Sequence, residues 1–271
     1  MGRPPEEAPV VFASPFPDVE IPDTTLTDYV LAHEVDLADK PALVDGPTGR
    51  TLTYGQLGAA IRSFAGGLAA RGFGPGDVLA LMSPNLPEYA IVFHGTAYAG
   101  AVVTTINPTY TAGEVRKQLL DSGATILVTI PTFLDTAREA IEGTGVTDIY
   151  VFGEAEGAAS VTDLLGAPLT AQVPRSTTDV VVLPYSSGTT GLSKGVMLTH
   201  RNLIANIAQV TTAAQIRSDE RFIAVLPFFH IYGMQVMMNC GLRSGATVIT
   251  MPRFDLEQFL SLHQEHGITR S

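Results

Sequence analysis

Glycines, hydroxyl side chains and one lysine are crowded into the stretch LPYSSGTTGLSKGVMLTH, at 183–200. Its glycines permit positive φ angles and let backbone N–H groups converge on an oxygen-rich ligand. Its hydroxyl groups add neutral donors, and Lys194 adds a compact positive charge that suits a phosphate. The stretch therefore predicts a phosphate-binding loop. The residues that we expect to bind the phosphates are Ser186, Ser187, Gly188, Thr189, Thr190, Gly191 and Lys194.

The spacing within this loop differs from that of a Walker loop, which needs G-x-x-x-x-G-K-[ST]. Gly188 and Gly191 are three residues apart, and Lys194 is followed by glycine. A stretch rich in serine, threonine and glycine can instead be a solvated linker. The buried strand pattern at 179–184 and the helical pattern that begins at Thr199 argue against a linker.

A second candidate site is the segment LPFFHIYGM, at 226–234, which directly follows a predicted strand. His230 would then lie at the carboxyl end of a strand, where α/β sheets place their ligands. As an alternative, a lone histidine beside Phe228 and Phe229 can be a packing residue. We expect no metal site at His230, because no second ligand lies at a useful spacing.

Helical and strand patterns alternate along the chain, which is typical of an α/β fold with parallel strands and right-handed crossovers. Residues 1–53 predict an N-terminal arm, a short helix and a hairpin. Residues 54–175 predict a first α/β subdomain. Residues 176–271 predict a second one, which carries the phosphate loop and is incomplete at its C-terminal end. Gly66 and Gly67 lie within a helical pattern and indicate close packing without a ligand.

Composition limits the classes of partner. A net charge of −11 repels phosphate backbones, which argues against nucleic acid. A single cysteine excludes an internal disulfide and favours a reducing, cytoplasmic location. The most apolar window, at 89–106, divides into a helix and a strand, so we expect no membrane span. The N-terminus is rich in proline and lacks the apolar core of a secretory signal.

The stretch YSSGTTGLSKGVMLTH, at 185–200, resembles the signature loop of the adenylate-forming superfamily. The stretch GAVVTTINPTYTAGEVRKQLLDSGATILVT, at 100–129, and LPFFHIYGM resemble its 4-coumarate-CoA ligase-like branch. The resemblance spans essentially the whole chain. It implies two stacked sheets flanked by helices, as part of a large N-terminal domain without the C-terminal lid. It also implies that the loop hydroxyls bind the β and γ phosphates, that His230 lines the carboxylate end of the acyl site, and that Tyr232 lies in the acyl pocket.

This resemblance implies an ATP-dependent acid–CoA ligase that uses ATP, Mg²⁺ and coenzyme A. A carboxylic acid would first form an acyl-adenylate with release of pyrophosphate, and coenzyme A would then displace AMP. Lys194 and His230 would be its catalytic residues. The segment LPFFHIYGM favours a hydroxycinnamate-like or other aromatic acid. An adenylating enzyme with a different acceptor stays open, because the acceptor depends on later sequence.

Members of this superfamily carry further motifs beyond the point where this sequence stops. These motifs contain the adenine-binding segment, the metal-holding glutamate, the ribose-binding aspartate and the lysine of the lid. We therefore expect a truncated chain with little or no ligase activity alone. Residues 268–270 begin a predicted strand at the end of the sequence, which leaves a sheet edge uncovered. The alternative is a non-catalytic nucleotide-binding fragment, or one that associates with itself through this edge.

Overall fold

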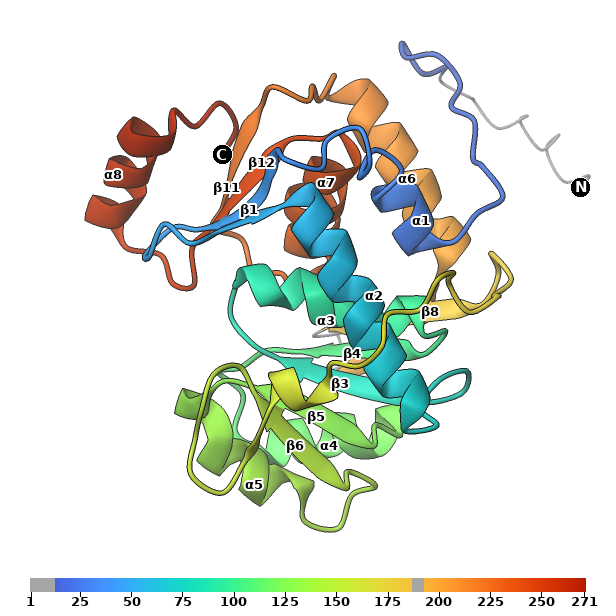
Figure 1. Cartoon of the computed structure of the whole chain (residues 1–271), viewed down its shortest axis with the longest axis vertical. Coiled ribbons are helices and arrows are strands. Elements are labelled where there is room, and N and C mark those ends of the chain that lie inside the picture. The colour runs from blue at the N-terminus through green and yellow to red at the C-terminus, as the bar shows by residue number, and fades with distance from the viewer. Residues whose placement is uncertain (1–12, 187–192) are drawn as a thin grey trace, which may run out of the picture.

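The computed structural model describes residues 13–186 and 193–271, which form two β-sheets with helices between and outside them (Figure 1). From edge to edge, the larger sheet contains β10 (Leu198–Thr199), β8 (Val180–Ser186), β4 (Val102–Ile106), β3 (Val78–Met82), β5 (Ile126–Thr129), β6 (Asp148–Val151) and β7 (Ala159–Ser160), and β9 (Lys194–Gly195) pairs with β8. The smaller sheet contains β11 (Arg221–Ala224), β12 (Thr247–Thr250), β1 (Pro41–Asp45) and β2 (Thr51–Thr53).

The helices form the layers around these sheets. They are α1 (Leu26–Val30), α2 (Tyr54–Ala70), α3 (Pro87–Tyr98), α4 (Ala112–Ser122), α5 (Leu134–Ile141), α6 (His200–Ala213), α7 (Cys240–Arg243) and α8 (Leu256–His266), with 3₁₀ turns at Pro131–Phe133 and Val161–Leu164 and a π-helix at Gly233–Asn239. Helices α2 and α3 lie between the two sheets, and their apolar residues share one core with residues of both sheets. Helices α4 and α5 cover the other face of the larger sheet, and α8 packs on the smaller one.

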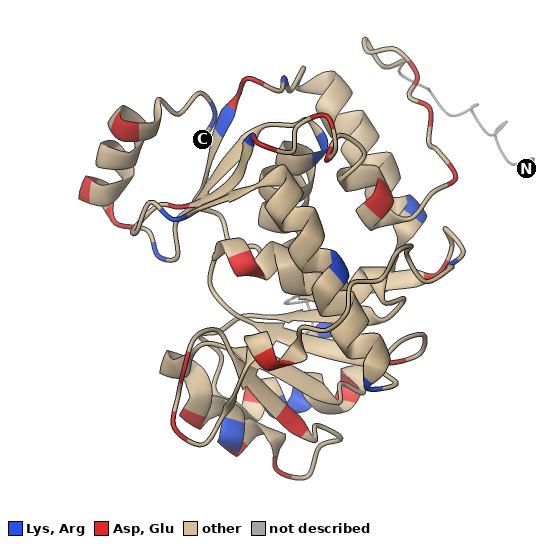
Figure 2. Cartoon of the chain, in the orientation of Figure 1, with Lys and Arg blue, Asp and Glu red and all other residues tan. Residues whose placement is uncertain are grey.

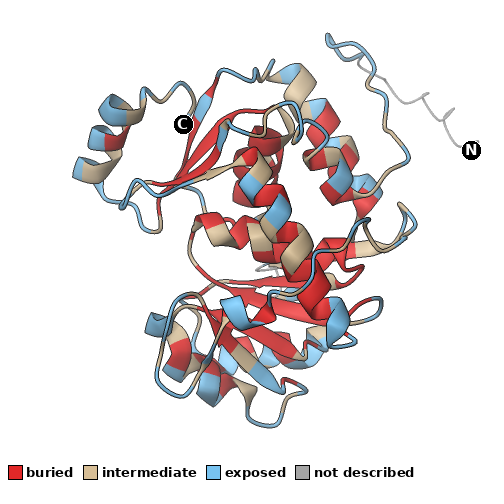
Figure 3. Cartoon of the chain, viewed as in Figure 1, coloured by how far each residue is buried: buried red, intermediate tan, exposed pale blue. Residues whose placement is uncertain are grey.

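Strand β3 shows why the central strands read as unbroken apolar runs. Leu79 and Leu81 belong to the core between the sheets, whereas Val78, Ala80 and Met82 belong to the core under α4 and α5. Successive side chains of a strand point to opposite faces, so a strand covered on both faces must be apolar at every position. The central strands of the larger sheet are accordingly coloured as buried in Figure 3.

The predicted α/β class with two stacked sheets is confirmed, and β3, β4, β5, β6 and β8 pair in parallel. Sheet membership does not follow the order of the chain. Strand β8 lies in the same sheet as β3 to β6, and β1 pairs with β12 from the end of the chain. Pairing partners are set by contacts between distant segments, which periodicity does not report.

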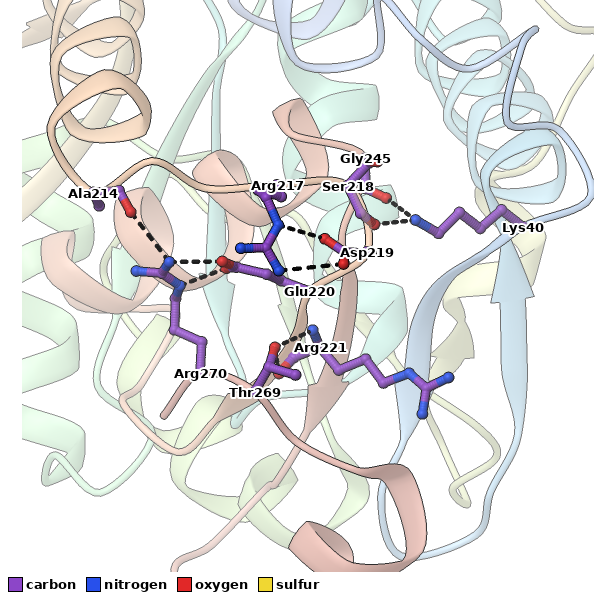
Figure 4. A network of polar contacts seen from close by, with 10 residues as sticks. All are labelled: Lys40, Ala214, Arg217, Ser218, Asp219, Glu220, Arg221, Gly245, Thr269 and Arg270. Carbon is purple, nitrogen blue, oxygen red and sulfur yellow. Dashed lines mark hydrogen bonds and ion pairs between the residues drawn. The ribbon is translucent and has the colours of Figure 1, made fainter.

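Residues 268–270 lie alongside β11, where they form an isolated bridge and no further strand. Arg270 forms a parallel bridge with Phe222, and the amide of Ile223 donates to the carbonyl oxygen of Arg270 at 3.0 Å. A polar network joins this segment to the start of β11 (Figure 4). Lys40, one of the three lysines, donates to the carbonyl oxygens of Ser218 and Gly245 in this network. Lys40 therefore connects the start of β1 to the segments that precede β11 and β12.

Gly67 is expected to tolerate no side chain, because α2 packs directly against the backbone of the segment after β7. A Cβ at Gly67 would lie 1.7 Å from the carbonyl oxygen of Leu164, and one at Gly66 would lie 1.9 Å from that of Ala167. Gly67→Ala should lower the free energy of unfolding by roughly 1–3 kcal/mol, through overpacking. Urea denaturation measures this loss.

The matched control is Gly113→Ala in α4, because nothing lies within 4 Å of a Cβ at that position. Alanine favours a helix over glycine, so this control should be neutral or slightly stabilising. Equal effects of the two substitutions would show that helix propensity, and not the contact of α2 with Leu164, decides the result.

Candidate functional site

The glycine-rich loop is closed at its base by a β-hairpin at the edge of the larger sheet. Strand β8 leaves the sheet at Ser186 and the chain returns as β9, with Ser186 paired to Lys194. The hydroxyl of Ser193 donates to the carbonyl oxygen of Ser186 at 3.1 Å, and the amide of Val196 donates to that of Pro184 at 2.9 Å. The hairpin therefore places the ammonium-bearing Lys194 directly beside the end of β8, where its side chain is exposed.

The middle of the predicted phosphate loop lies outside the described residues. Ser187, Gly188, Thr189, Thr190 and Gly191 fall within 187–192. Of the loop residues that the sequence singled out, the structure thus places Ser186 and Lys194, and these two are paired, with Ser193 beside them.

The connection from the loop to the next helix differs from the simple strand–loop–helix expectation. Two short strands, β9 and β10, both run antiparallel to β8 before α6 begins. Thr199 caps α6 by accepting from the amide of Asn202 at 3.1 Å. Because β9 and β10 intervene, Lys194 lies in a hairpin and not at the first turn of that helix.

Two polar side chains, Asn85 and Thr105, fix the segment that contains His230 to the same edge of the larger sheet. The amide of Asn85, just beyond β3, donates to the carbonyl oxygens of Ala224 at 2.8 Å and Leu226 at 3.0 Å, and its oxygen accepts from the amide of Phe228 at 2.7 Å. Asn85 is buried, so all three bonds lie in a dry environment. The backbone of 224–228 is therefore held in one position.

Thr105 joins the two candidate segments. In β4 it is paired with Pro184 of β8, two residues before Ser186. Its hydroxyl donates at 2.8 Å to the carbonyl oxygen of Phe229, the neighbour of His230. One buried threonine thus brings the base of the glycine-rich loop and the His230 segment to a common edge, at the carboxyl ends of parallel strands where α/β proteins bind ligands.

His230 and Tyr232 are both exposed in this segment, Tyr232 by 50%. The Nδ1 atom of His230 accepts from the amide of Tyr232 at 3.3 Å. Directly after them the chain forms the π-helix, and Gly233 approaches so closely that a Cβ would lie 2.1 Å from the carbonyl oxygen of Pro227. The packing alternative considered for His230 does not hold, because its exposed side chain is not part of the core.

A cavity of about 800 Å³ lies beside the hairpin. Its lining combines residues of α4 with Tyr110, Tyr185 and Ser193. Charged residues are spread over helices and loops along the ribbon in Figure 2. The cavity wall carries both signs of charge, from Lys117 and Glu114. The cavity alone therefore selects no single charge for a ligand.

Within 13–186 and 193–271, no group of three histidine, cysteine, aspartate or glutamate residues could hold a metal ion. None of the helices in the same ranges combines the length and apolarity needed to cross a membrane.

Asn85 and Thr105 were not singled out from the sequence, although both follow a recognisable pattern. Asn85 follows the buried strand pattern VLALM and Thr105 lies near the end of VVTTI, and a buried polar side chain in such a place must find a partner. Their partners lie more than 120 positions away along the chain. Only the folded arrangement could identify them.

Fold and site together describe a parallel α/β domain with a glycine-rich hairpin and a histidine segment at one sheet edge. A family model described as AMP-binding enzyme matches residues 32–270. The chain therefore belongs to the AMP-binding enzyme family, which confirms the resemblance found in the motifs.

Among curated proteins, the chain is 42% identical over 278 residues to 4-coumarate–CoA ligase 5 of Oryza sativa subsp. japonica, covering 99% of this chain and 50% of the relative. It is 37% identical over 267 residues to 4-coumarate–CoA ligase 1 of Petroselinum crispum, covering 96% and 49%. The chain thus spans about half the length of the curated relatives that it matches. A crystal structure of a long-chain-fatty-acid–CoA ligase from Archaeoglobus fulgidus has the same fold, with a TM-score of 0.87 at 24% identity over 95% of this chain and 53% of that one.

Proposed function

We propose that this chain provides the ATP- and carboxylate-binding part of an acid–CoA ligase that activates an aromatic, hydroxycinnamate-like acid. The observation that carries the proposal is the junction at Thr105, which holds the base of the glycine-rich loop and the His230 segment at one edge. A reaction between a nucleotide phosphate and a carboxylate needs both reactants side by side. The named activity of the curated relatives supports the same acid class.

In the proposed first step, a carboxylate oxygen of the acid attacks the α-phosphorus of ATP. The bond from that phosphorus to the bridging oxygen breaks, and pyrophosphate leaves with the electron pair. Lys194 would stabilise the negative charge that develops on the leaving phosphates, and the hydroxyl groups of the loop would orient them. A thiolate, proposed to be that of coenzyme A, would then attack the acyl carbon and displace AMP.

His230 and Tyr232 are proposed to face the acid. Both side chains are exposed at the sheet edge, beyond a backbone that Asn85 and Thr105 hold in place. The imidazole of His230 would orient the carboxylate, and the ring of Tyr232 offers an apolar surface for an aromatic acid. The reaction is also proposed to use Mg²⁺ together with ATP, as the resemblance implies.

Lys194→Ala is expected to weaken ATP binding by about tenfold or more, because a hydrogen bond to a charged phosphate contributes about 1.5–3 kcal/mol. Isothermal titration calorimetry with ATP and with inorganic pyrophosphate measures the change. Arg201→Ala is the matched control, since it removes the same charge from the exposed surface of α6. Equal affinities for Lys194→Ala and the parent chain would refute the proposed phosphate loop.

We further propose that these 271 residues bind ATP without completing ligation. The chain spans about half the length of the ligases that it matches, and in those ligases the other half is proposed to supply further contacts to the nucleotide. Pyrophosphate exchange with an aromatic acid tests this directly. Turnover by the isolated chain would contradict this part of the proposal. It would not contradict the proposal that the loop binds phosphate.

A further inference from the structure

The geometry points to a latch, formed by Tyr185, Asp121 and Gly195, that positions Lys194 for the phosphates of the nucleotide. The three residues come from β8, α4 and β9. The inference rests on the proposed function of Lys194, and it adds positioning residues that the motifs did not reveal.

The first part of the latch is the packing of Tyr185 across the hairpin. Tyr185 is paired with Gly195, and the next pair is Ser186 with Lys194. A Cβ at Gly195 would lie 3.1 Å from Cζ and 3.2 Å from the hydroxyl oxygen of Tyr185. Glycine at this position therefore leaves the space that the phenol ring occupies, and the ring contacts the residue next to Lys194.

The second part is the bond from Tyr185 to α4. Its hydroxyl donates to Oδ2 of Asp121 at 2.6 Å, a short distance that is typical of a bond to a carboxylate. Burial and the neighbouring Asp121 carboxylate raise the pKa of Tyr185, so the phenol keeps its proton and remains the donor. The amino-terminal end of α4 is held by Thr111, which accepts from the amide of Glu114 at 3.4 Å. The hairpin is thereby tied to a capped helix.

The position of Tyr185 explains why a latch is needed. The pairing between β8 and β4 ends at Pro184 with Thr105, so Tyr185 and Ser186 extend beyond the sheet with β9 as their paired strand. A short hairpin that projects from a sheet opens more easily than the sheet itself. The bond to Asp121 restrains this projection, and it affects the position of Lys194 more than the stability of the whole fold.

Tyr185→Phe is expected to weaken ATP affinity about threefold to fivefold, because it removes one hydrogen bond and keeps the ring. Asp121→Ala should give the same loss, and the double variant should lose no more than either single one. Asp121→Asn should retain most of the affinity, since its amide oxygen can still accept from the phenol. Thermal unfolding of all four variants should stay close to that of the parent chain.

The decisive comparison places Tyr185→Phe in a Lys194→Ala background. If the latch acts through Lys194, the second substitution has no further effect on affinity. Parent-like affinity of Tyr185→Phe beside a weakened Lys194→Ala would overturn the latch and leave the phosphate loop standing. Unchanged affinity in Lys194→Ala would overturn both. A lowered unfolding temperature with unchanged affinity would assign Tyr185 a purely structural role.

Discussion

Acidification from pH 7 to pH 4 is expected to lower the free energy of unfolding by about 3 kcal/mol through His94 alone. Burial lowers the pKa of His94 to about 4, although its bond to Asn239 acts in the opposite direction. In the unfolded chain the same histidine has a pKa of about 6.5. Between these values the unfolded state binds more protons, so stability is complete above pH 6.5 and is lost as the pH falls towards 4.

The contacts of His94 show why the neutral form is preferred. Asn239 donates through its amide nitrogen to Gln235 at 2.7 Å, so its oxygen faces Nε2 of His94 at 3.1 Å. Nε2 therefore carries the proton, and Nδ1 faces the hydroxyl of Thr27 at 3.2 Å. All these side chains are buried. A second proton on the ring would introduce a charge without a carboxylate partner among them, which is strongly unfavourable.

Urea denaturation at a series of pH values between 7 and 4 measures this effect. His94→Asn should reduce the slope of unfolding free energy against pH in this window, whatever it costs in absolute stability. His200→Asn should reduce it separately, because burial and the nearby Arg175 also lower the pKa of His200 to about 4. An unchanged slope in both variants would show that these histidines do not control acid sensitivity.

Arg270→Met is expected to lower the free energy of unfolding by about 2–3 kcal/mol, because it leaves a buried carboxylate without its partner. Glu220 is only 7% exposed at its side chain, and Arg270 donates to its two oxygens at 2.6 and 2.8 Å (Figure 4). The guanidinium also donates to the carbonyl oxygen of Ala214 at 3.2 Å. The exposed fraction of Arg270, 31%, places the expected loss below that for a fully buried pair.

Two comparisons by urea denaturation at pH 7 test whether the unpaired carboxylate of Glu220 causes the loss of stability in Arg270→Met. Glu220→Gln should cost less than Arg270→Met, and the double variant should be more stable than Arg270→Met alone, because no buried charge remains. Arg217→Met serves as the control in the same network. Its pair with Asp219 is exposed by 68% and 71%, so its loss should be below about 1 kcal/mol. Equal losses for Arg217→Met and Arg270→Met would contradict the argument from burial.

Much of the local structure could be predicted from the sequence. The helix at 256–266, its closure by Gly267 and the helix that starts at Tyr54 follow from periodicity and from capping residues. The strand VLALM and the hairpin before Tyr54 were also found where their patterns indicate. Such signals are contained within short windows of the chain, so no distant contact is needed to identify them. The residues of the signature loop are also contiguous in the sequence, and their resemblance to a known motif identified the family.

The sequence by itself determined the class of fold, the family and the two segments that carry the candidate chemistry. The tertiary structure decided which strands share a sheet, that β9 and β10 separate Lys194 from α6, and that Thr105 brings His230 to the end of β8. It also revealed the bond from Tyr185 to Asp121. The physical reason is that Thr105 and Phe229 are 124 positions apart, and Tyr185 and Asp121 are 64 positions apart, so these pairs meet only when the whole core is packed.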